Sequence, residues 1–521
     1  MPARRLAQSR WLWIFVLAGL SACFLVRKVT VVELDRGSDS VQVRTPVKVH
    51  LIDGATVVYP AGVLVLRNSL VGEGTWYDLT LRNPTTIHAL TLDSVVGLES
   101  YQTNIDGGAT VVVSLLATAG AIGIGVGIAC AVDPKCFGSC PTYYSDSAGT
   151  PVLEAEGFSY SISPLFEARD VDRLRGRPDG DGVFRLEVRN EAFETHYINH
   201  LELLEATHGP GEFVLPDNEG KPVALSRQDP SRSARDRAGR DVLDALSGAD
   251  GRVYSTASSV MARVQSGDTE DWIELTFDDT SPGDSVALVL RLRNSLLNTV
   301  LLYDIMLGDP GARSLDWQGR HLSRIGPALE LGAWYGATMG MAVEVWRDGG
   351  WVPVAKVKDS GPVAWKDVAI PLEATGSSLK LRLRFPADNW RIDRLALAHE
   401  MARPALRTLP LTRLTSLDGQ PDSEAFAGVL ANDERYLQTQ AGQAFIASWD
   451  AGAAPSGRER SFLLASQGYY IEWVRRGWIA SARDTTTFRP SDSALQKAIL
   501  RWSQVQDSLE QRFFATRVPV R

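Results

Sequence analysis

The stretch that decides the fold is Val183-Phe-Arg-Leu-Glu-Val-Arg-Asn190, followed shortly by Tyr197-Ile-Asn-His-Leu-Glu-Leu-Leu204. In the first run apolar side chains recur at every second position, which is the period of a half-buried β-strand. A third strand-like run, Glu459–Trp473, lies far along the chain. The pattern predicts a mainly β protein with several domains.

The N-terminal part of the chain has its own β pattern. The run Val47-Lys-Val-His-Leu-Ile-Asp-Gly54 continues into Ala55-Thr-Val-Val-Tyr-Pro60, and an Asp-Gly pair between two apolar runs is a hairpin signal. Further strand-like stretches follow at 63–66, 75–81 and 88–92. We therefore expect a small β domain over residues 23–106.

The rest of the chain divides by composition into further segments. We expect a β-rich domain over 133–265, a β-sandwich-like domain over 266–400 and another β-rich domain over 401–484. The Gly-, Pro- and Asp-rich residues 209–239 predict loops, and residues 240–246 a short helix. Residues 271–400 are again β-rich, with strand-like stretches at 273–277, 285–294, 342–347, 351–356 and 379–385.

The C-terminal segment, 485–521, has the apolar spacing of an amphipathic helix. Its apolar residues recur at intervals of three and four, as Leu495, Ile499, Trp502, Val505, Leu509 and Phe513. We expect this helix to dock on its own domain; the alternative is a helix that binds a partner or a membrane surface.

Composition excludes several classes of protein. The 521 residues carry 54 Lys+Arg against 62 Asp+Glu, a net charge of −8, and 44% are hydrophobic. An acidic balance argues against a nucleic-acid-binding protein, and an ordinary apolar fraction argues against a disordered chain. Four cysteines are too few for a disulfide scaffold.

The first residues have the layout of a bacterial export signal. Arg4, Arg5 and Arg10 precede the apolar run Trp11–Leu20, which is too short to span a bilayer. The run ends in Leu20-Ser-Ala-Cys23, which resembles the lipobox of bacterial lipoproteins. The resemblance implies a signal peptide over 1–22 and a fatty-acylated (palmitate-bearing) Cys23 that anchors the protein in membrane lipid. The alternatives are a plain signal peptide with a chance Cys and an uncleaved anchor helix.

Removal of residues 1–22 would change the net charge to −11, because they hold three arginines and no acids. Position 24 is Phe and not Asp. By resemblance to the enterobacterial sorting rule, this favours the outer membrane over the inner one.

A second apolar stretch covers residues 107–132, which carry no charge. Its length is sufficient for a transmembrane helix. Small residues recur every four positions, the pattern of closely packed membrane helices, so a helix–helix partner is possible here. The alternative is a helix or hairpin buried in protein.

The segment Gly138-Ser-Cys-Pro-Thr-Tyr-Tyr144, followed by Glu154-Ala-Glu-Gly-Phe-Ser-Tyr-Ser-Ile-Ser-Pro-Leu-Phe-Glu-Ala-Arg-Asp-Val-Asp-Arg-Leu174, resembles a family of uncharacterised bacterial exported lipoproteins. The resemblance covers about residues 46–300. It implies export and lipidation but supplies no activity.

Cys136 and Cys140 are candidates for a disulfide, because two cysteines this close in an exported protein tend to oxidise. Free thiols are the first alternative. Redox or metal chemistry is the second, although the pair is not C-x-x-C and lacks further soft ligands nearby.

Other polar motifs do not reach a catalytic or metal-binding pattern. His196 and His200 fall in the predicted strand, where they would lie about 13 Å apart, so we expect surface histidines and no metal site. Asp179-Gly-Asp-Gly182 predicts a hairpin turn. Tryptophans in the later segments could pack in cores or line a carbohydrate- or peptide-binding face: Trp317, Trp334, Trp346, Trp351, Trp365 and Trp390.

These patterns predict a cell-envelope lipoprotein with a structural or ligand-binding role and no identifiable catalytic residues, cofactor or metal. The ligand stays unknown. An envelope hydrolase assembled from dispersed residues is one alternative. A membrane-embedded component of an oligomeric assembly, packed through residues 107–132, is another.

Overall fold

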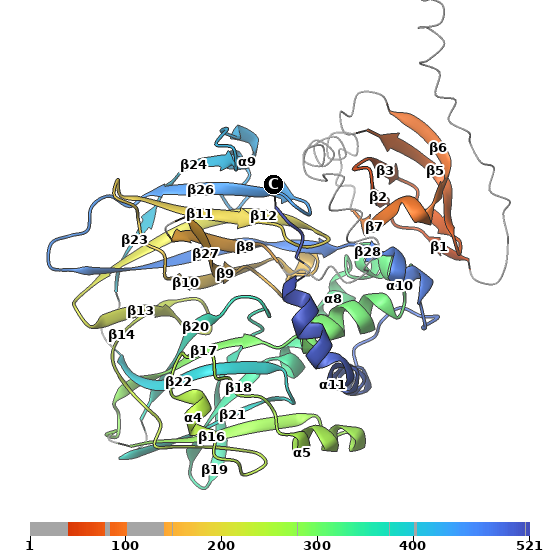
Figure 1. Ribbon diagram of the computed structural model, residues 1–521. Helices are drawn as coiled ribbons and strands as arrows, with labels where there is room; N and C mark the ends of the chain where they lie inside the picture. The colour runs from red at the N-terminus through yellow and green to blue at the C-terminus, as the bar shows by residue number, and fades with distance from the viewer. Residues whose placement is uncertain are drawn as a thin grey trace, which may run out of the picture. The chain divides into compact units, whose positions relative to one another are not determined.

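The computed structural model describes residues 40–78, 84–101, 140–147, 149–278, 280–374, 376–400, 404–515 and 517–520. The lipobox with Cys23, the apolar segment 107–132 and Cys136 lie outside these ranges. The fold is mainly β, as the alternating pattern predicts. Within the described ranges the strands form five sheets, and every pair of named strands is antiparallel (Figure 1).

The N-terminal sheet, sheet A, contains the predicted hairpin. Asp53 Oδ1 accepts a hydrogen bond from the Ala55 backbone N–H at 3.0 Å, and Gly54 has φ +81°, which suits glycine best. The last strand of the sheet comes from the far end of the chain. Its strands are β1 (Val41–Val43), β2 (Val47–Leu51), β3 (Thr56–Tyr59), β4 (Val63–Val65), β5 (Ser69–Tyr77), β6 (Thr85–Thr91), β7 (Val95–Ser100) and β28 (Val474–Arg475).

Sheets B and C each combine strands from residues 133–265 with strands from 401–484. Sheet B has the order β24-β26-β11-β8-β9, and sheet C the order β10-β27-β12-β23, with β25 on β12. Sheet B consists of β8 (Thr142–Ser147), β9 (Thr150–Glu156), β11 (Val183–Arg189), β24 (Leu411–Ser416) and β26 (Ala444–Asp450). Sheet C consists of β10 (Ala168–Leu174), β12 (Glu194–His208), β23 (Ala405–Leu409), β25 (Leu437–Thr439) and β27 (Glu459–Glu472).

Sheets D and E hold the remaining strands. Sheet D consists of β13 (Glu212–Pro216), β14 (Pro222–Asp229), β17 (Ser285–Asn294), β20 (Lys366–Glu373) and β22 (Trp390–Glu400). Sheet E consists of β15 (Ser233–Asp236), β16 (Glu270–Asp278), β18 (Met341–Arg347), β19 (Gly350–Val357) and β21 (Ser378–Pro386).

The prediction of loops over 209–239 was wrong, because β13, β14 and β15 lie there. The Pro, Gly and Asp residues that suggested loops occupy the short turns between these strands. Both β14 and β15 find partners far along the chain, in β22 and β16, and composition alone does not reveal such pairing.

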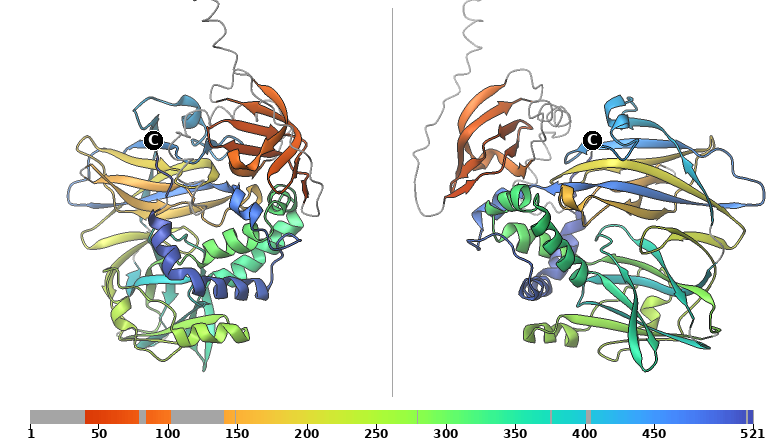
Figure 2. Two further views of the ribbon diagram at one scale, coloured as in Figure 1. Left: turned by 45° about the vertical axis from the view of Figure 1, so that its right-hand side comes forward. Right: turned by 180° about the vertical axis from the view of Figure 1, so that it is seen from behind.

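Apolar side chains bury the faces of sheets B to E in successive layers (Figures 1 and 2). Phe184 of sheet B and Phe462 of sheet C belong to the first core. Leu204 of sheet C and Val214 of sheet D belong to the second. Leu288 of sheet D and Leu381 of sheet E belong to the third. A strand segment buried on both faces is apolar without alternation, as residues 286–290 of β17 are.

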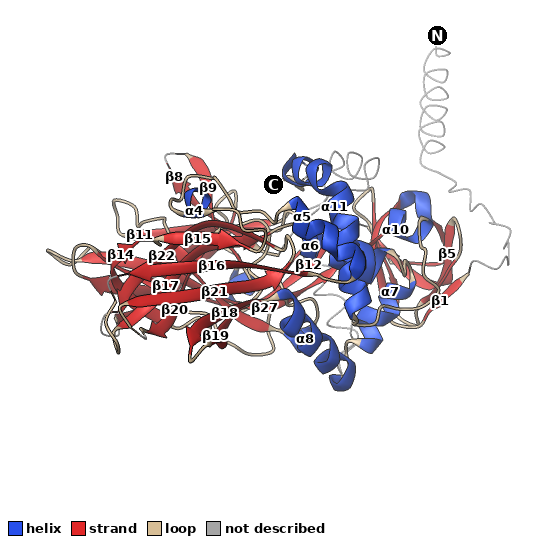
Figure 3. Ribbon diagram, turned by 90° about the horizontal axis from the view of Figure 1, so that it is seen from below, coloured by secondary structure: helices blue, strands red, loops and turns tan. Residues whose placement is uncertain are grey.

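Most of the described helical residues gather between these sheets and sheet A (Figure 3). The helices are α4 (Leu243–Leu246), α5 (Ser258–Met261), η4 (Ala262–Ser266), α6 (Leu297–Thr299), the π-helix η5 (Val300–Gly308), α7 (Arg313–Asp316), the π-helix η6 (Trp317–His321), α8 (Ile325–Met339), α9 (Ser423–Ala427), α10 (Arg476–Ala480) and α11 (Asp492–Ala515). Short 3₁₀ turns lie at η2 (Leu92–Ser94) and η3 (Pro164–Phe166).

Two helical predictions are confirmed, and one helical stretch was not predicted. The C-terminal helix is α11, whose apolar face packs into the helical core through Leu495, Ile499 and Trp502. A short helix is present as α4. The region 271–400 is β-rich as predicted, but residues 297–339 within it are mainly helical. The sequence did not reveal these helices, because an apolar run by itself does not distinguish a strand from a buried helix.

In the part of the chain that the structure describes, no helix has the length and hydropathy needed to cross a membrane.

A buried carboxylate joins sheet A to sheet C. Glu99 of β7 is fully buried. Its carboxylate accepts hydrogen bonds from Lys48 Nζ at 3.4 Å, His50 Nε2 at 3.1 Å and the Tyr197 hydroxyl at 3.1 Å. Burial raises the pKa of Glu99, but the Lys48 ammonium and the His50 hydrogen bond outweigh that effect and hold the pKa at about 2. Burial lowers the pKa of His50, so its ring is neutral and Lys48 supplies the countercharge.

We expect Glu99→Gln to lower the free energy of unfolding by about 3–5 kcal/mol, because Lys48 would stay buried without a countercharge. The measurement is equilibrium unfolding in urea. The matched control is Lys48→Met with Glu99→Leu, which removes both charges and should recover most of the loss. Equal destabilisation of the single and the double variant would contradict the counterion role of Glu99.

Candidate functional site

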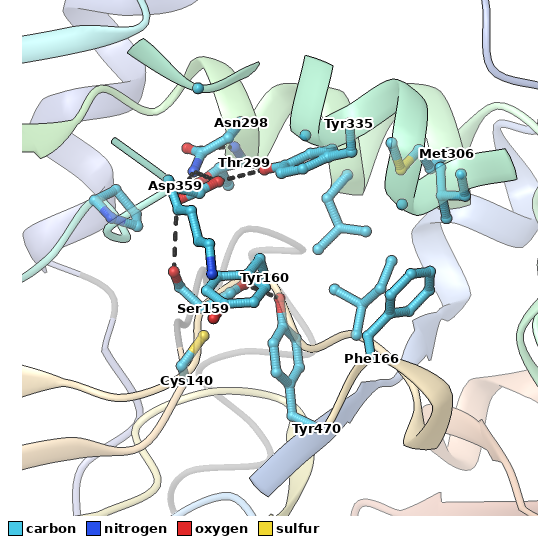
Figure 4. Close-up of a pocket in the computed structure, with 18 of the residues that line it drawn as sticks. Cys140, Ser159, Tyr160, Phe166, Asn298, Thr299, Met306, Tyr335, Asp359 and Tyr470 are labelled. Atoms are coloured by element: carbon cyan, nitrogen blue, oxygen red, sulfur yellow. Dashed lines mark hydrogen bonds between the residues drawn. The ribbon is translucent and has the colours of Figure 1, made fainter. Parts of the chain in front are cut away.

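A cavity of about 320 Å³ lies where the helices meet sheets B and C. One wall is η5, which contributes Leu302 and Met306, and a second is α8, with Leu331. The turn after β9 supplies Phe166, and Tyr470 comes from β27. Figure 4 shows Tyr335 and Met306 on one side of the cavity and Phe166 and Tyr470 on the other.

Most of the lining is apolar or aromatic. This size and lining are typical of the small end of small-molecule sites in proteins. The π-helical wall agrees with the frequent occurrence of such helices at functional sites.

Asp359 ties three walls of the cavity together. Its carboxylate accepts hydrogen bonds from Asn298 Nδ2 at 3.0 and 3.2 Å, from the Tyr335 hydroxyl, from Ser159 Oγ at 3.4 Å and from the Gly361 backbone N–H at 2.9 Å (Figure 4). These donors come from α6, α8, the turn after β9 and the 358–364 loop. Asp359 therefore sets the spacing of the walls.

Glu156, at the end of β9, holds the same loop from the opposite side. Its Oε2 accepts from the backbone N–H groups of Val363 at 2.7 Å and Ala364 at 3.1 Å. Gly361 has φ +76°, and a Cβ there would lie 2.4 Å from the Glu156 carboxyl carbon, so only glycine fits. Both carboxylates that line the cavity thus serve to position its walls.

Burial shifts the pKa of several ionisable groups around the cavity toward the neutral form. Burial raises the pKa of Tyr335, Tyr303 and Tyr470 well above the ordinary range, so all three phenols keep their protons. Burial also raises the pKa of the Cys140 thiol, which disfavours the nucleophilic thiolate. Burial lowers the pKa of Lys356, whose Nζ donates to the Ala337 carbonyl at 2.8 Å.

Glycines on α8 leave room for the cavity. A Cβ at Gly332 would lie 3.0 Å from the Phe166 ring, whereas a Cβ at Gly336 would meet no atom within 4 Å. Gly336 lines the cavity and Gly326, on the same helix, does not, although a Cβ at Gly326 would also meet open space.

Some of the residues singled out in the sequence lie within the described ranges, and others do not. Cys140 is buried and lines the cavity, while its expected disulfide partner Cys136 lies outside the described ranges, as does Cys23. His196 lies on a strand as predicted, but it is fully buried and not on the surface. Its Nε2 lies 2.6 Å from Glu194 Oε1 and its Nδ1 lies 3.2 Å from Thr439 Oγ1.

Asp179–Gly182 forms a turn, in which Asp179 Oδ1 accepts from the backbone N–H groups of Asp181 and Val183, both at 3.0 Å. The prediction of a hairpin was wrong, because β10 before the turn belongs to sheet C and β11 after it to sheet B. Among the described residues, no group of three or more His, Cys, Asp or Glu side chains is arranged to hold a metal ion.

The tryptophans divide between core and surface. Trp317 and Trp390 are core residues. Trp346 and Trp351 form an edge-to-face pair at 5.1 Å on the β18–β19 hairpin, where Arg382 lies 4.8 Å from the Trp351 ring centroid. Trp346 is partly exposed, so a small aromatic surface exists on sheet E in addition to the cavity.

The cavity residues Asn298, Tyr335 and Asp359 did not emerge from the sequence, because each stands alone outside any motif. One available signal was the spacing of Gly332, Gly336 and Gly340 at intervals of four in an apolar run. On a helix this spacing leaves one flat face, which can border a cavity or a closely packed neighbour.

No protein-family model matches the chain, and no curated protein matches it either. Solved structures with some likeness include TmCBM61 in complex with beta-1,4-galactotriose, at 12% identity over 47% of this chain and 94% of that one, with a TM-score of 0.14. A GH31 alpha-xylosidase from Xanthomonas citri aligns at 9% identity over 84% of this chain and 38% of its own length, with a TM-score of 0.15.

An exo-beta-1,3-galactanase from Phanerochaete chrysosporium, in complex with beta-1,3-galactotriose, aligns at 11% identity over 69% of this chain and 82% of its own, with a TM-score of 0.18. At these TM-scores the likenesses carry no argument about this chain.

We expect Asp359→Asn to lower the free energy of unfolding by about 2–3 kcal/mol, because an amide replaces an acceptor that several donors share. Urea unfolding measures the change. Asp507→Asn, an exposed substitution on α11, is the control and should leave stability unchanged. Equal stability of the two variants would show that Asp359 does not tie the walls together.

Proposed function

We propose that this chain is a lipoprotein of the bacterial cell envelope that binds an apolar small molecule in the cavity between η5, α8 and β27. The observation that carries the binding role is the cavity itself, with apolar and aromatic walls around a hydrogen-bonded carboxylate. The signal and lipobox ending at Cys23 support the envelope placement, and Phe24 favours the outer membrane.

The same residues support binding without catalysis. Asp359 accepts hydrogen bonds from four residues of the walls and Glu156 from two backbone N–H groups, and burial keeps the Cys140 thiol protonated. A general base needs a free lone pair aimed at substrate, and a nucleophile needs an activated form. These groups are instead arranged to shape a site.

The ligand chemistry follows from the lining. A molecule with an apolar body would contact Phe166, Leu302, Met306 and Leu331, and a polar end could hydrogen-bond to neutral tyrosine hydroxyls. Lys358, which also lines the cavity and is exposed, favours a ligand whose polar end is neutral or anionic.

The test of the binding role uses the full chain and 1-anilinonaphthalene-8-sulfonate, an apolar anionic dye. We expect saturable fluorescence enhancement, and Gly336→Phe should weaken the dye affinity at least about tenfold, since Gly336 lines the cavity and the new ring would meet open space there. Gly326→Phe, on the same helix but away from the cavity, should leave affinity unchanged. Equal affinities for both variants would contradict the site.

The test of the anchor is separate. We expect Cys23→Ala to abolish incorporation of radiolabelled palmitate and to release the protein from the membrane fraction, because the acylated sulfur is absent. Cys130→Ala is the matched control and should be labelled like the parent. Continued labelling of the Cys23→Ala protein would contradict the lipoprotein assignment.

A further inference from the structure

The outward face of α8 is unusually apolar for a surface helix. Ile325 and Leu329 are 69% and 67% exposed, and the exposed Ala333 and Ala337 continue the row at intervals of four. Glu330 is the only charged residue of the helix. Figure 3 shows α8 at the border of the molecule, beside the stacked sheets.

The opposite face of α8 is already in use. Leu331 and Met339 belong to the helical core, and Ala328 is buried. The short turn η3 contacts α8, and it exposes another apolar residue, Leu165, at 48%. The exposed face therefore has no role in the described core, and we name the set Ile325, Leu329, Ala333 and Leu165 the apolar face.

A basic hollow adjoins the start of α8. Arg44, Arg320, His321 and Arg324 line an open hollow of about 430 Å³. No ion pair joins any of the three arginines to a carboxylate within the described ranges. Asp316 also lines the hollow, but its Oδ1 already accepts from the backbone N–H groups of Arg44 at 2.9 Å and Thr45 at 2.7 Å.

Such a group of unpaired cations stands out in a chain with a net charge of −8. Cations that adjoin exposed aliphatic side chains match the composition of an anionic lipid surface, in which phosphates lie next to acyl chains.

The basic hollow lies close in sequence to the lipid-anchor residue Cys23, as expected for a surface that contacts a membrane. Gln42, which lines the hollow, lies two residues after Ser40, the first described residue. Cys23 precedes Ser40 by 17 residues, so the chain between them spans at most about 60 Å. A lipid on Cys23 would keep the hollow within that distance of the bilayer.

We propose that the apolar face of α8 and the basic hollow form a docking surface for an anionic phospholipid bilayer. Ile325 and Leu329 enter the boundary between head groups and acyl chains, and Arg320 and Arg324 contact lipid phosphates. This surface goes beyond the ligand-binding role, because it sets which side of the protein faces the membrane. The cavity also borders α8, so docking would hold the cavity beside the bilayer.

The experiment uses the full-length chain with Cys23→Ala, so that acylation does not mask weaker contacts, and flotation with vesicles of phosphatidylglycerol and phosphatidylethanolamine. In this background, Ile325→Ser with Leu329→Ser should lower the vesicle-bound fraction at least about fivefold. Val352→Ser with Val354→Ser, which removes two exposed aliphatic side chains (43% and 38%) from β19, is the matched control and should bind like the parent. Residues 1–22 are present in all variants, so any contribution that they make to vesicle binding is the same in each variant.

Charge is tested in the same assay. Arg320→Glu with Arg324→Glu should lower binding to the anionic vesicles about as strongly, and added salt should weaken binding by the parent. Replacing phosphatidylglycerol with phosphatidylcholine should remove the difference between this charge variant and the parent.

Three outcomes would overturn the proposal. Equal vesicle binding by the α8 variant and the β19 control would exclude α8 as the docking face. A lower melting temperature of the α8 variant, with unchanged vesicle binding, would show that another part of the chain covers the face. A loss of dimer in gel filtration, again with unchanged vesicle binding, would identify a second copy as its occupant. Dye binding should persist in the α8 variant, so a failure of docking is distinguishable from a failure of the cavity.

Discussion

The antiparallel pairing of β12 with β27 is the interaction on which the rest of the structure depends. The ladder runs from Glu194 opposite Glu472 to His208 opposite Glu459, with one irregularity between Ile198 and His200. β27 also pairs with β10, and the chain continues from it directly into β28, which joins sheet A through β7. The chain segments before and after sheets D and E are thus brought together in one sheet.

This ladder places two carboxylic acids opposite each other inside the protein. Glu194 and Glu472 are both buried, and burial raises the pKa of Glu194 to about 7 and that of Glu472 well above its ordinary value. Arg475 Nη2 donates to Glu472 Oε1 at 2.6 Å, and the burial of His196 lowers its pKa to about 3, so that the ring is neutral. Burial thus favours the protonated form of Glu472, and Arg475 adds a single cation, so the ladder does not hold two unpaired facing charges.

The cavity depends on the same ladder indirectly, through a residue of β27. Tyr470, on β27, lines the cavity, and its hydroxyl donates to the Ser159 carbonyl at 3.0 Å in the turn after β9. The Ser159 hydroxyl in turn reaches Asp359, which holds α6 and α8. A binding site thus forms where a strand from the end of the chain, a turn from its first half and helices from its middle converge.

The sequence alone determined the local structure wherever one short period was decisive. The alternation in 183–190 predicted β11, the Asp-Gly pair predicted the β2–β3 hairpin, and intervals of three and four predicted α11. It did not reveal β13 to β15, because turn residues dominate that stretch, nor the helices of 297–339, because an apolar run fits a buried strand or a buried helix equally well.

The cavity and the partners of each strand were decided only by the tertiary structure. Asn298, Ser159, Tyr335 and Asp359 are unremarkable singly and become a network through contacts between residues far apart in the sequence. The physical reason is that hydrophobic periodicity reports which face of an element is buried, whereas the choice of neighbour depends on burial and hydrogen bonding summed over the whole fold.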